Sequence, residues 1–179
     1  MKRKIILSLA TSLDGYILDK YRKFDWIKGD GDKSHDTENK FDFSKFLNTV
    51  DTIVMGRKSF EDATIESIEI FKSKKLLVAT HRKLNTKYDN VEVINGDIVN
   101  IISKLKKEKG KDIWLYGGAI LADQFIKKNI IDEYIIAIIP IILGGGIQLF
   151  LKNNPKIELH LNECVVQDGM VIVKYKKRK

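Results

Sequence analysis

Four short segments of this chain combine glycines, cations and hydroxyl groups at the ends of apolar runs. They read ATSLDG (10–15), MGRKS (55–59), ATHR (79–82) and YGGA (116–119). Glycine has no Cβ, so an anion can approach the neighbouring backbone N–H groups closely. Arg and Lys add charge-assisted hydrogen bonds to phosphate or carboxylate. The residue types therefore indicate binding of a negatively charged ligand, provided that the fold brings the segments together.

The glycine pair Gly117–Gly118 is followed by a helical pattern, and a helix N-terminus attracts negative charge. A tight turn between a strand and a helix explains the pair equally well. In MGRKS, two cations stand at the start of another expected helix, where they are unfavourable unless an anion binds. The alternative is a cap by Ser59 with solvated basic side chains. Neither segment matches GxGxxG or GxxxxGK[ST].

The third segment adds Thr80, His81 and Arg82, although a lone histidine is more often a surface residue than a ligand. Taken together, the helix starts and the additional arginine suit a dinucleotide that carries a pyrophosphate and a further phosphate. NADPH has these groups. The formal net charge of +8 agrees with an anionic ligand.

The elements that must position these residues alternate between strands and helices. Apolar periodicity predicts strands at 5–10, 52–56, 75–81, 91–96, 113–116 and 133–143 and helices at 37–50, 97–110 and 119–129, with a further helix opening at Ser59. QDG (167–169) predicts a terminal hairpin. Such alternation is typical of a mostly parallel sheet covered on both faces, whose ligands bind at the carboxyl ends of the strands.

Composition predicts one globular domain over residues 1–179, with 44% hydrophobic and 31% charged residues. The single cysteine, Cys164, excludes an internal disulfide, and no Cys/His spacing suggests a metal site. We expect a cytoplasmic protein. The basic start and apolar run at 5–10 resemble a signal peptide, but the run is short. The run at 134–143 is too short to span a membrane. Basic residues gather at 104–111 and 174–179, but no aromatics interleave the first run and no nucleic-acid-binding signature appears, so we do not expect a nucleic-acid partner.

The order and wording of several segments resemble the dihydrofolate reductase superfamily. The resemblance is closer to the C-terminal reductase domain of the bifunctional riboflavin-biosynthesis deaminase-reductase and its stand-alone relatives. The segments that carry it are SLDGYI (12–17), FDWI (24–27), DTIVMGRKSFE (51–61), IWLYGGAILADQFI (113–126) and DEYIIAIIPIILGGGIQLF (132–150). The last segment points to the riboflavin-type branch rather than to true dihydrofolate reductases.

This resemblance implies an α/β fold of the three-layer αβα dihydrofolate reductase type, with a mostly parallel sheet and an antiparallel C-terminal hairpin. It also implies NADPH as the cofactor, hydride transfer to a pyrimidine- or pteridine-like substrate, and a homodimer. The model reaction is that of 5-amino-6-(5-phosphoribosylamino)uracil reductase. The cofactor-binding residues that it implies are Ala10 and Gly15 near the nicotinamide, Gly56, Arg57, Lys58, Ser59, Thr80, His81 and Arg82 at the adenosine phosphates, and Tyr116, Gly117, Gly118, Ala119 and Ile120 at the pyrophosphate.

For catalysis, the dihydrofolate reductase pattern places a carboxylate on the helix after the tryptophan loop. Asp42 is the candidate, and a solvated acid on a helix face is the alternative reading. A true dihydrofolate reductase is the second enzymatic hypothesis. A non-catalytic nucleotide- or nucleic-acid-binding domain that kept the fold is the hypothesis from another class, because fold alone does not define function.

Overall fold

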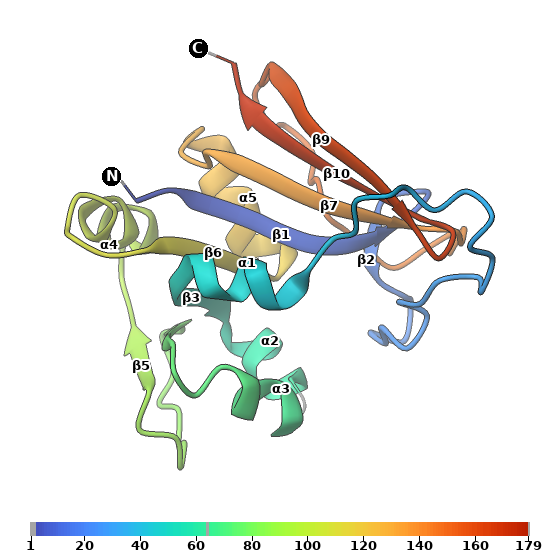
Figure 1. The fold of residues 1–179 in the computed structure, drawn as a ribbon. Helices are drawn as coiled ribbons and strands as arrows, with labels where there is room; N and C mark the ends of the chain where they lie inside the picture. The colour runs from blue at the N-terminus through green and yellow to red at the C-terminus, as the bar shows by residue number, and fades with distance from the viewer. Residues whose placement is uncertain (1–2, 64, 179) are drawn as a thin grey trace.

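A computed structural model describes residues 3–63 and 65–178 (Figure 1). Its main feature is an eight-stranded sheet in the order β5-β4-β3-β6-β1-β7-β10-β9. The strands of this sheet are β1 (Ile5–Ser12), β3 (Val50–Gly56), β4 (Lys75–Ala79), β5 (Val91–Ile94), β6 (Asp112–Gly117), β7 (Glu133–Ile139), β9 (Leu159–Gln167) and β10 (Met170–Lys177). Two short strands, β2 (Tyr16–Leu18) and β8 (Ile147–Gln148), form a separate antiparallel pair.

Strands β5, β4, β3, β6, β1 and β7 run parallel to one another. Strand β10 pairs antiparallel with β7, and β9 pairs antiparallel with β10. The turn between β9 and β10 contains Asp168 and Gly169, both of which have positive φ. The predicted mostly parallel sheet with an antiparallel C-terminal hairpin is therefore confirmed. Parallel strands place their carboxyl ends along one edge, and this brings the four chemistry-bearing segments together.

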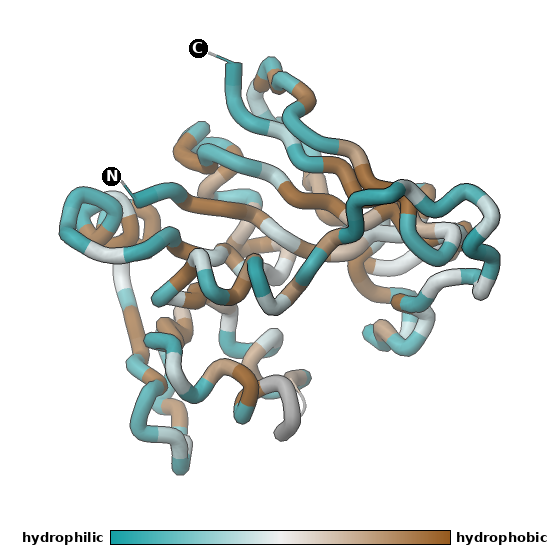
Figure 2. The backbone as a smooth tube through the Cα atoms, in the orientation of Figure 1, coloured by the Kyte–Doolittle hydropathy of each residue, from teal (hydrophilic) through white to brown (hydrophobic). Residues whose placement is uncertain are grey.

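Helices cover both faces of the sheet and give it three layers. The helices are α1 (Phe43–Thr49), α2 (Arg57–Asp62), α3 (Ile65–Ile70), α4 (Ile98–Leu105) and α5 (Ala119–Lys127). Apolar side chains of α4 and α5 pack in one core, and those of α1, the end of α2 and α3 pack in the other. Figure 2 shows hydrophobic segments running along the central strands between these layers. We call the two sides the α4/α5 face and the α1/α2 face.

Several predicted boundaries are wrong, each for a physical reason that the structure shows. The helix expected at 37–50 begins only at Phe43, because the backbone of Thr37 donates to the Val166 carbonyl (2.9 Å) and Asp42 caps the helix. The helix expected at 97–110 ends at Leu105, where the hydrogen bonds tighten to the three-residue type, as from Lys107 to Lys104. Strand β7 ends at Ile139, before Pro140, which has no N–H to donate.

Shorter elements were not predicted at all. Helix α3 and the β2–β8 pair contain six residues or fewer per element, too few for a periodic signal. Within the described part of the chain, no helix is long and apolar enough to cross a membrane. The same residues contain no cluster of three or more His, Cys, Asp or Glu side chains suited to a metal ion. The single domain and the homodimer stay predictions.

Candidate functional site

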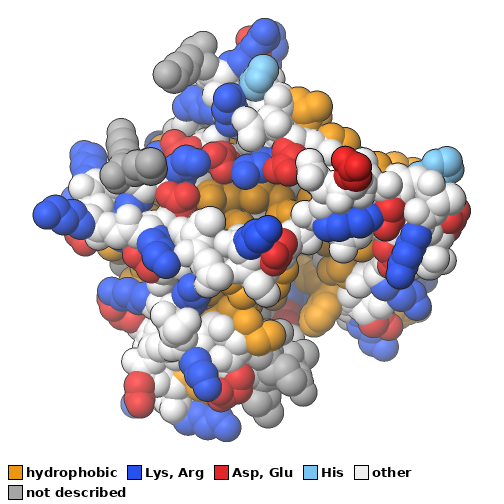
Figure 3. All heavy atoms as spheres, viewed as in Figure 1, with side chains coloured by type: hydrophobic (Ala, Val, Ile, Leu, Met, Phe, Trp, Pro, Cys, Tyr) orange, Lys and Arg blue, Asp and Glu red, His pale blue; other side chains and the backbone are white. Residues whose placement is uncertain are grey.

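A cavity of about 660 Å³ lies at the carboxyl edge of the parallel strands. This volume falls within the range of small-molecule sites. Its lining comes from both sides of the sheet: Leu9, Ala79 and Leu121 belong to the α4/α5 face, whereas Trp114 and Tyr116 belong to the α1/α2 face. A ligand in this cavity would therefore wrap around the ends of the strands. Figure 3 shows hydrophobic side chains in a hollow that charged side chains surround.

The start of α5 forms one wall of the cavity. Gly117 has φ +120°, in the region that favours glycine, and Gly118 is the N-cap residue, joined to it by a cis peptide bond. Gly118, Ala119 and Ile120 line the cavity. The first N–H groups of a helix have no partner within that helix, so they are free to bind an anion. A Cβ at Gly118 would lie 3.2 Å from Ser59 Oγ, which shows how narrow the gap between α5 and α2 is.

Helix α2 supplies the opposite side of this gap with Arg57, Lys58 and Ser59, all of which line the cavity together with Gly56. The helix has only six residues, so its dipole contributes little and its side chains must supply the attraction for anions. Arg57 Nε donates to Glu61 Oε1 at 2.6 Å, which orients the guanidinium. Lys58 is exposed.

At the end of β4, Thr80 and His81 line the cavity. Arg82 is exposed and lies outside the lining, and its N–H donates to Thr80 Oγ1 at 3.0 Å. Ala10 and Tyr116 also line the cavity. Burial raises the pKa of the Tyr116 phenol above its ordinary value of 10.0, so the hydroxyl keeps its proton at neutral pH.

Gly15 has a positive φ (+86°) and lies outside the cavity lining. Its carbonyl accepts a hydrogen bond from the Leu149 N–H (3.0 Å), which attaches the end of β1 to the segment after β8. Asp14 reinforces this attachment by accepting from Ser12 Oγ (2.6 Å) and from the N–H of Leu143 and Gly144. These bonds, that of the Ser12 hydroxyl first, hold the pKa of the Asp14 carboxyl below its ordinary value.

Asp42 lies at the N-terminus of α1 and outside the cavity lining. Its Oδ1 accepts from the Lys45 N–H at 2.9 Å, the usual geometry of a helix cap. This bond gives Asp42 a structural role in α1.

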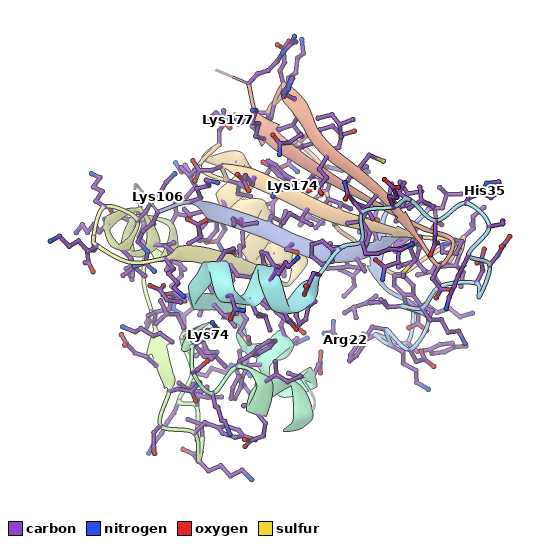
Figure 4. The ribbon with its side chains drawn as sticks, in the orientation of Figure 1. Arg22, His35, Lys74, Lys106, Lys174 and Lys177 are labelled. Carbon is purple, nitrogen blue, oxygen red and sulfur yellow. The ribbon has the colours of Figure 1, made fainter. Side chains whose placement is uncertain are left out.

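Sequence reasoning missed the other end of the cavity. Arg22, Phe24 and Ile27, from the loop after β2, line it opposite Asp62 at the end of α2. Arg22 Nη2 and Asp62 Oδ2 are 3.3 Å apart, and Figure 4 shows Arg22 between this loop and the α2–α3 region. No local pattern marks such a pair, because the two residues are 40 positions apart. Trp114 could have been found, since it alternates with Tyr116 on one face of β6.

The sheet order, the layers and the position of the cavity define a protein of the dihydrofolate reductase fold. Residues 62–173 match the model of the RibD C-terminal domain. The chain is 37% identical over 188 aligned positions to the uncharacterized protein YyaP of Bacillus subtilis, covering 97% of this chain and 95% of that one. YwjB of the same organism, also uncharacterized, is 36% identical over 165 positions, covering 89% and 90%. The chain belongs to the RibD C-terminal domain family.

Solved structures agree with this assignment. A protein named for riboflavin biosynthesis from Shewanella sp. PV-4 is 28% identical, with a TM-score of 0.80 and coverage of 98% of this chain and 99% of that one. The Thermotoga maritima diaminohydroxyphosphoribosylaminopyrimidine deaminase/5-amino-6-(5-phosphoribosylamino)uracil reductase has a TM-score of 0.70 at 16% identity, and the match covers 99% of this chain and 57% of that one. Dihydrofolate reductase of Enterococcus faecalis, solved with NADP(H), has a TM-score of 0.63 at 14% identity, covering 100% and 99%. The last two matches show the fold alone.

Proposed function

We propose that this protein is an NADPH-dependent reductase that transfers hydride to a pyrimidine- or pteridine-like acceptor. One observation carries the proposal: a single cavity is lined by the start of α5, by the cations of α2 and by the end of β4. Membership of the RibD C-terminal domain family supports the coarser class of oxidoreductase. The names and ligands of the structural relatives support the cofactor.

The residues present fit a dinucleotide with three phosphates. Gly118 leaves the narrow gap open, so a pyrophosphate can approach the free N–H groups of α5. Arg57, Lys58 and His81 can meet the additional phosphate that distinguishes NADPH from NADH. The small side chain of Ala10 at the end of β1 leaves room for a flat ring.

Bound NADPH would supply a hydride to a carbon of a C=N or C=C bond in the acceptor, whose other atom takes a proton from solvent, leaving NADP⁺. The chain contributes binding and the exclusion of water. Leu9, Ile17 and Ile147 form apolar walls at the sheet edge and limit access of water to the reacting atoms. Ile17 and Ile147 lie in the β2–β8 pair. The segment after β1 holds this pair in place, because Asp14 accepts from the loop before β8 and Gly15 accepts from Leu149, which follows β8.

The test is a fluorescence titration of the purified protein with NADPH and, separately, with NADH. We expect tighter binding of NADPH. Oxidation of NADPH is then followed by absorbance with a panel of pteridines and ribosylaminopyrimidines. If neither dinucleotide binds at millimolar concentration, the proposal is wrong, and a domain that kept the fold without the chemistry becomes the better reading.

A further inference from the structure

The part of the cavity between Trp114 and the loop after β2 has a different character from the part that meets the starts of α2 and α5. Its floor consists of Trp114 and Tyr116, with Ser8 and Ala10, which alternate onto the same face of β1. Its mouth is lined by Arg22, Phe24, Ile27, Asp62 and Ala63. We call this part the acceptor half. The inference below concerns the acceptor that it takes, and it rests on the proposed reductase function.

Arg22 is held in place by its own loop. Asp19 Oδ1 accepts from the N–H groups of Tyr21 and Lys23, both at 2.8 Å, and Arg22 itself has a positive φ of 65°. Trp26 is buried, and its indole N–H donates to the Lys23 carbonyl at 3.0 Å. The guanidinium therefore reaches Asp62 from a fixed backbone rather than from a freely moving loop. The resulting ion pair connects the two sides of the mouth.

The charges of the acceptor half cancel. Among its described lining residues, Arg22 is the one cation, and the Asp62 carboxylate lies 3.3 Å from it. Phosphate-binding sites usually offer several unpaired cations or backbone N–H groups. A phosphate entering this mouth would meet a cation that is already paired and would be repelled by Asp62. Arg57 differs from Arg22, because its partner Glu61 lies outside the cavity lining, whereas Asp62 lines the cavity.

The remaining lining is apolar and aromatic. Phe24 and Ile27 are each 42% exposed, although such side chains are normally buried, and they stand at the mouth opposite Trp114 and Tyr116. Aromatic surfaces of this kind stack on flat rings. We propose that the acceptor is an uncharged, unphosphorylated planar heterocycle, and that the Arg22–Asp62 pair selects against its phosphorylated form.

Two matched pairs of probes test the proposal: uridine with uridine 5′-monophosphate, and riboflavin with riboflavin 5′-phosphate. Each is titrated into the protein saturated with NADP⁺, which prevents turnover, and binding is read from tryptophan or flavin fluorescence. We expect the unphosphorylated member of at least one pair to bind about ten-fold tighter, a ratio typical of one unfavourable charge contact.

Two variants change the charge of the mouth in opposite directions. Asp62→Asn releases Arg22 and should tighten binding of the phosphorylated probes about five-fold, with little effect on the others. Arg22→Gln leaves the Asp62 carboxylate without its cation and should weaken binding of the phosphorylated probes further. Both partners are about two-fifths exposed, at 41% and 43%, so neither change should unfold the protein. Glu69→Gln, on the exposed side of α3, makes the same charge change as Asp62→Asn outside the cavity and should alter no ratio.

The proposal is overturned if the phosphorylated probes bind more tightly to the unmodified protein, or if Asp62→Asn leaves the ratios unchanged. It is also overturned if no probe binds while NADPH binding is intact. Loss of NADPH binding itself would instead contradict the proposed reductase function, so the two failures are distinguishable.

Discussion

Replacing Gly118 by alanine tests whether this glycine is needed for folding or for binding a ligand. The backbone at Gly118 has φ −73° and ψ −177°, which any residue adopts. The new Cβ would lie 3.2 Å from Ser59 Oγ, a hydroxyl that can shift by a few tenths of an ångström. The folded protein should therefore tolerate the change, with a loss of stability below about 1 kcal/mol.

The substitution should instead lower the affinity for the dinucleotide. The added methyl group lies between α5 and α2, where the proposed pyrophosphate must approach the backbone. Loss of one hydrogen bond to a charged group costs about 1.5–3 kcal/mol, which corresponds to roughly a 10- to 150-fold weaker Kd. Fluorescence titration with NADPH gives the Kd, and thermal unfolding of the same sample shows whether the fold is intact.

Gly145→Ala is the matched control, because a Cβ there meets nothing within 4 Å and the residue lies outside the cavity lining. Its affinity for NADPH should equal that of the unmodified protein. If Gly118→Ala binds NADPH normally, the glycine pair is only a turn between β6 and α5. If the variant unfolds at a much lower temperature, the assumption that the Ser59 hydroxyl can shift is wrong.

Substitutions of Arg57, Asp42 and Asp14 give three further expected outcomes. Arg57→Ala should weaken binding of NADPH about ten-fold and binding of NADH much less, because it removes a charge-assisted bond to the additional phosphate. Equal weakening of both affinities in parallel titrations would contradict this assignment. Asp42→Asn should leave turnover of any identified acceptor unchanged, since asparagine also caps α1, whereas loss of kcat with an intact fold would identify Asp42 as the proton donor. Asp14→Asn should lower Tm at pH 7, because the carboxylate accepts bonds from Ser12 and the 143–144 backbone. The depressed pKa of Asp14 means that this stabilisation exists above the ordinary value of 3.8 and is lost as pH falls through the folded-state pKa, so the Tm difference should shrink in acid; a constant difference would refute it.

Long and strongly patterned elements were predictable from the sequence. The run at 5–10, the stripe of Ile98 and Ile102 and the QDG turn all lie in elements of the expected type. Their boundaries were less predictable, because side chains elsewhere decide them: the pairing of Thr37 with Val166 keeps residues 37–42 out of α1. The β2–β8 pair depends on contacts between residues about 130 positions apart, which no local window contains.

The sequence by itself determined the segments of the proposed cofactor region, because each segment is local. A glycine pair before a helix and cations after a strand are properties of a few consecutive residues, and the alternation of strands and helices already places strand ends on one edge. Most of the residues expected there do line the cavity, whereas Gly15, Arg82, Gly117 and Asp42 lie outside its lining.

Only the tertiary structure decided the acceptor half. Arg22 and Asp62 come from different segments, and their pairing depends on where the fold places the loop after β2 relative to the end of α2. Trp114 forms the floor because β6 lies between β3 and β1 in the sheet. Two charges cancel at a cavity mouth only when their side chains lie close together. The distance between side chains from remote segments is set by the tertiary fold and cannot be read from the sequence.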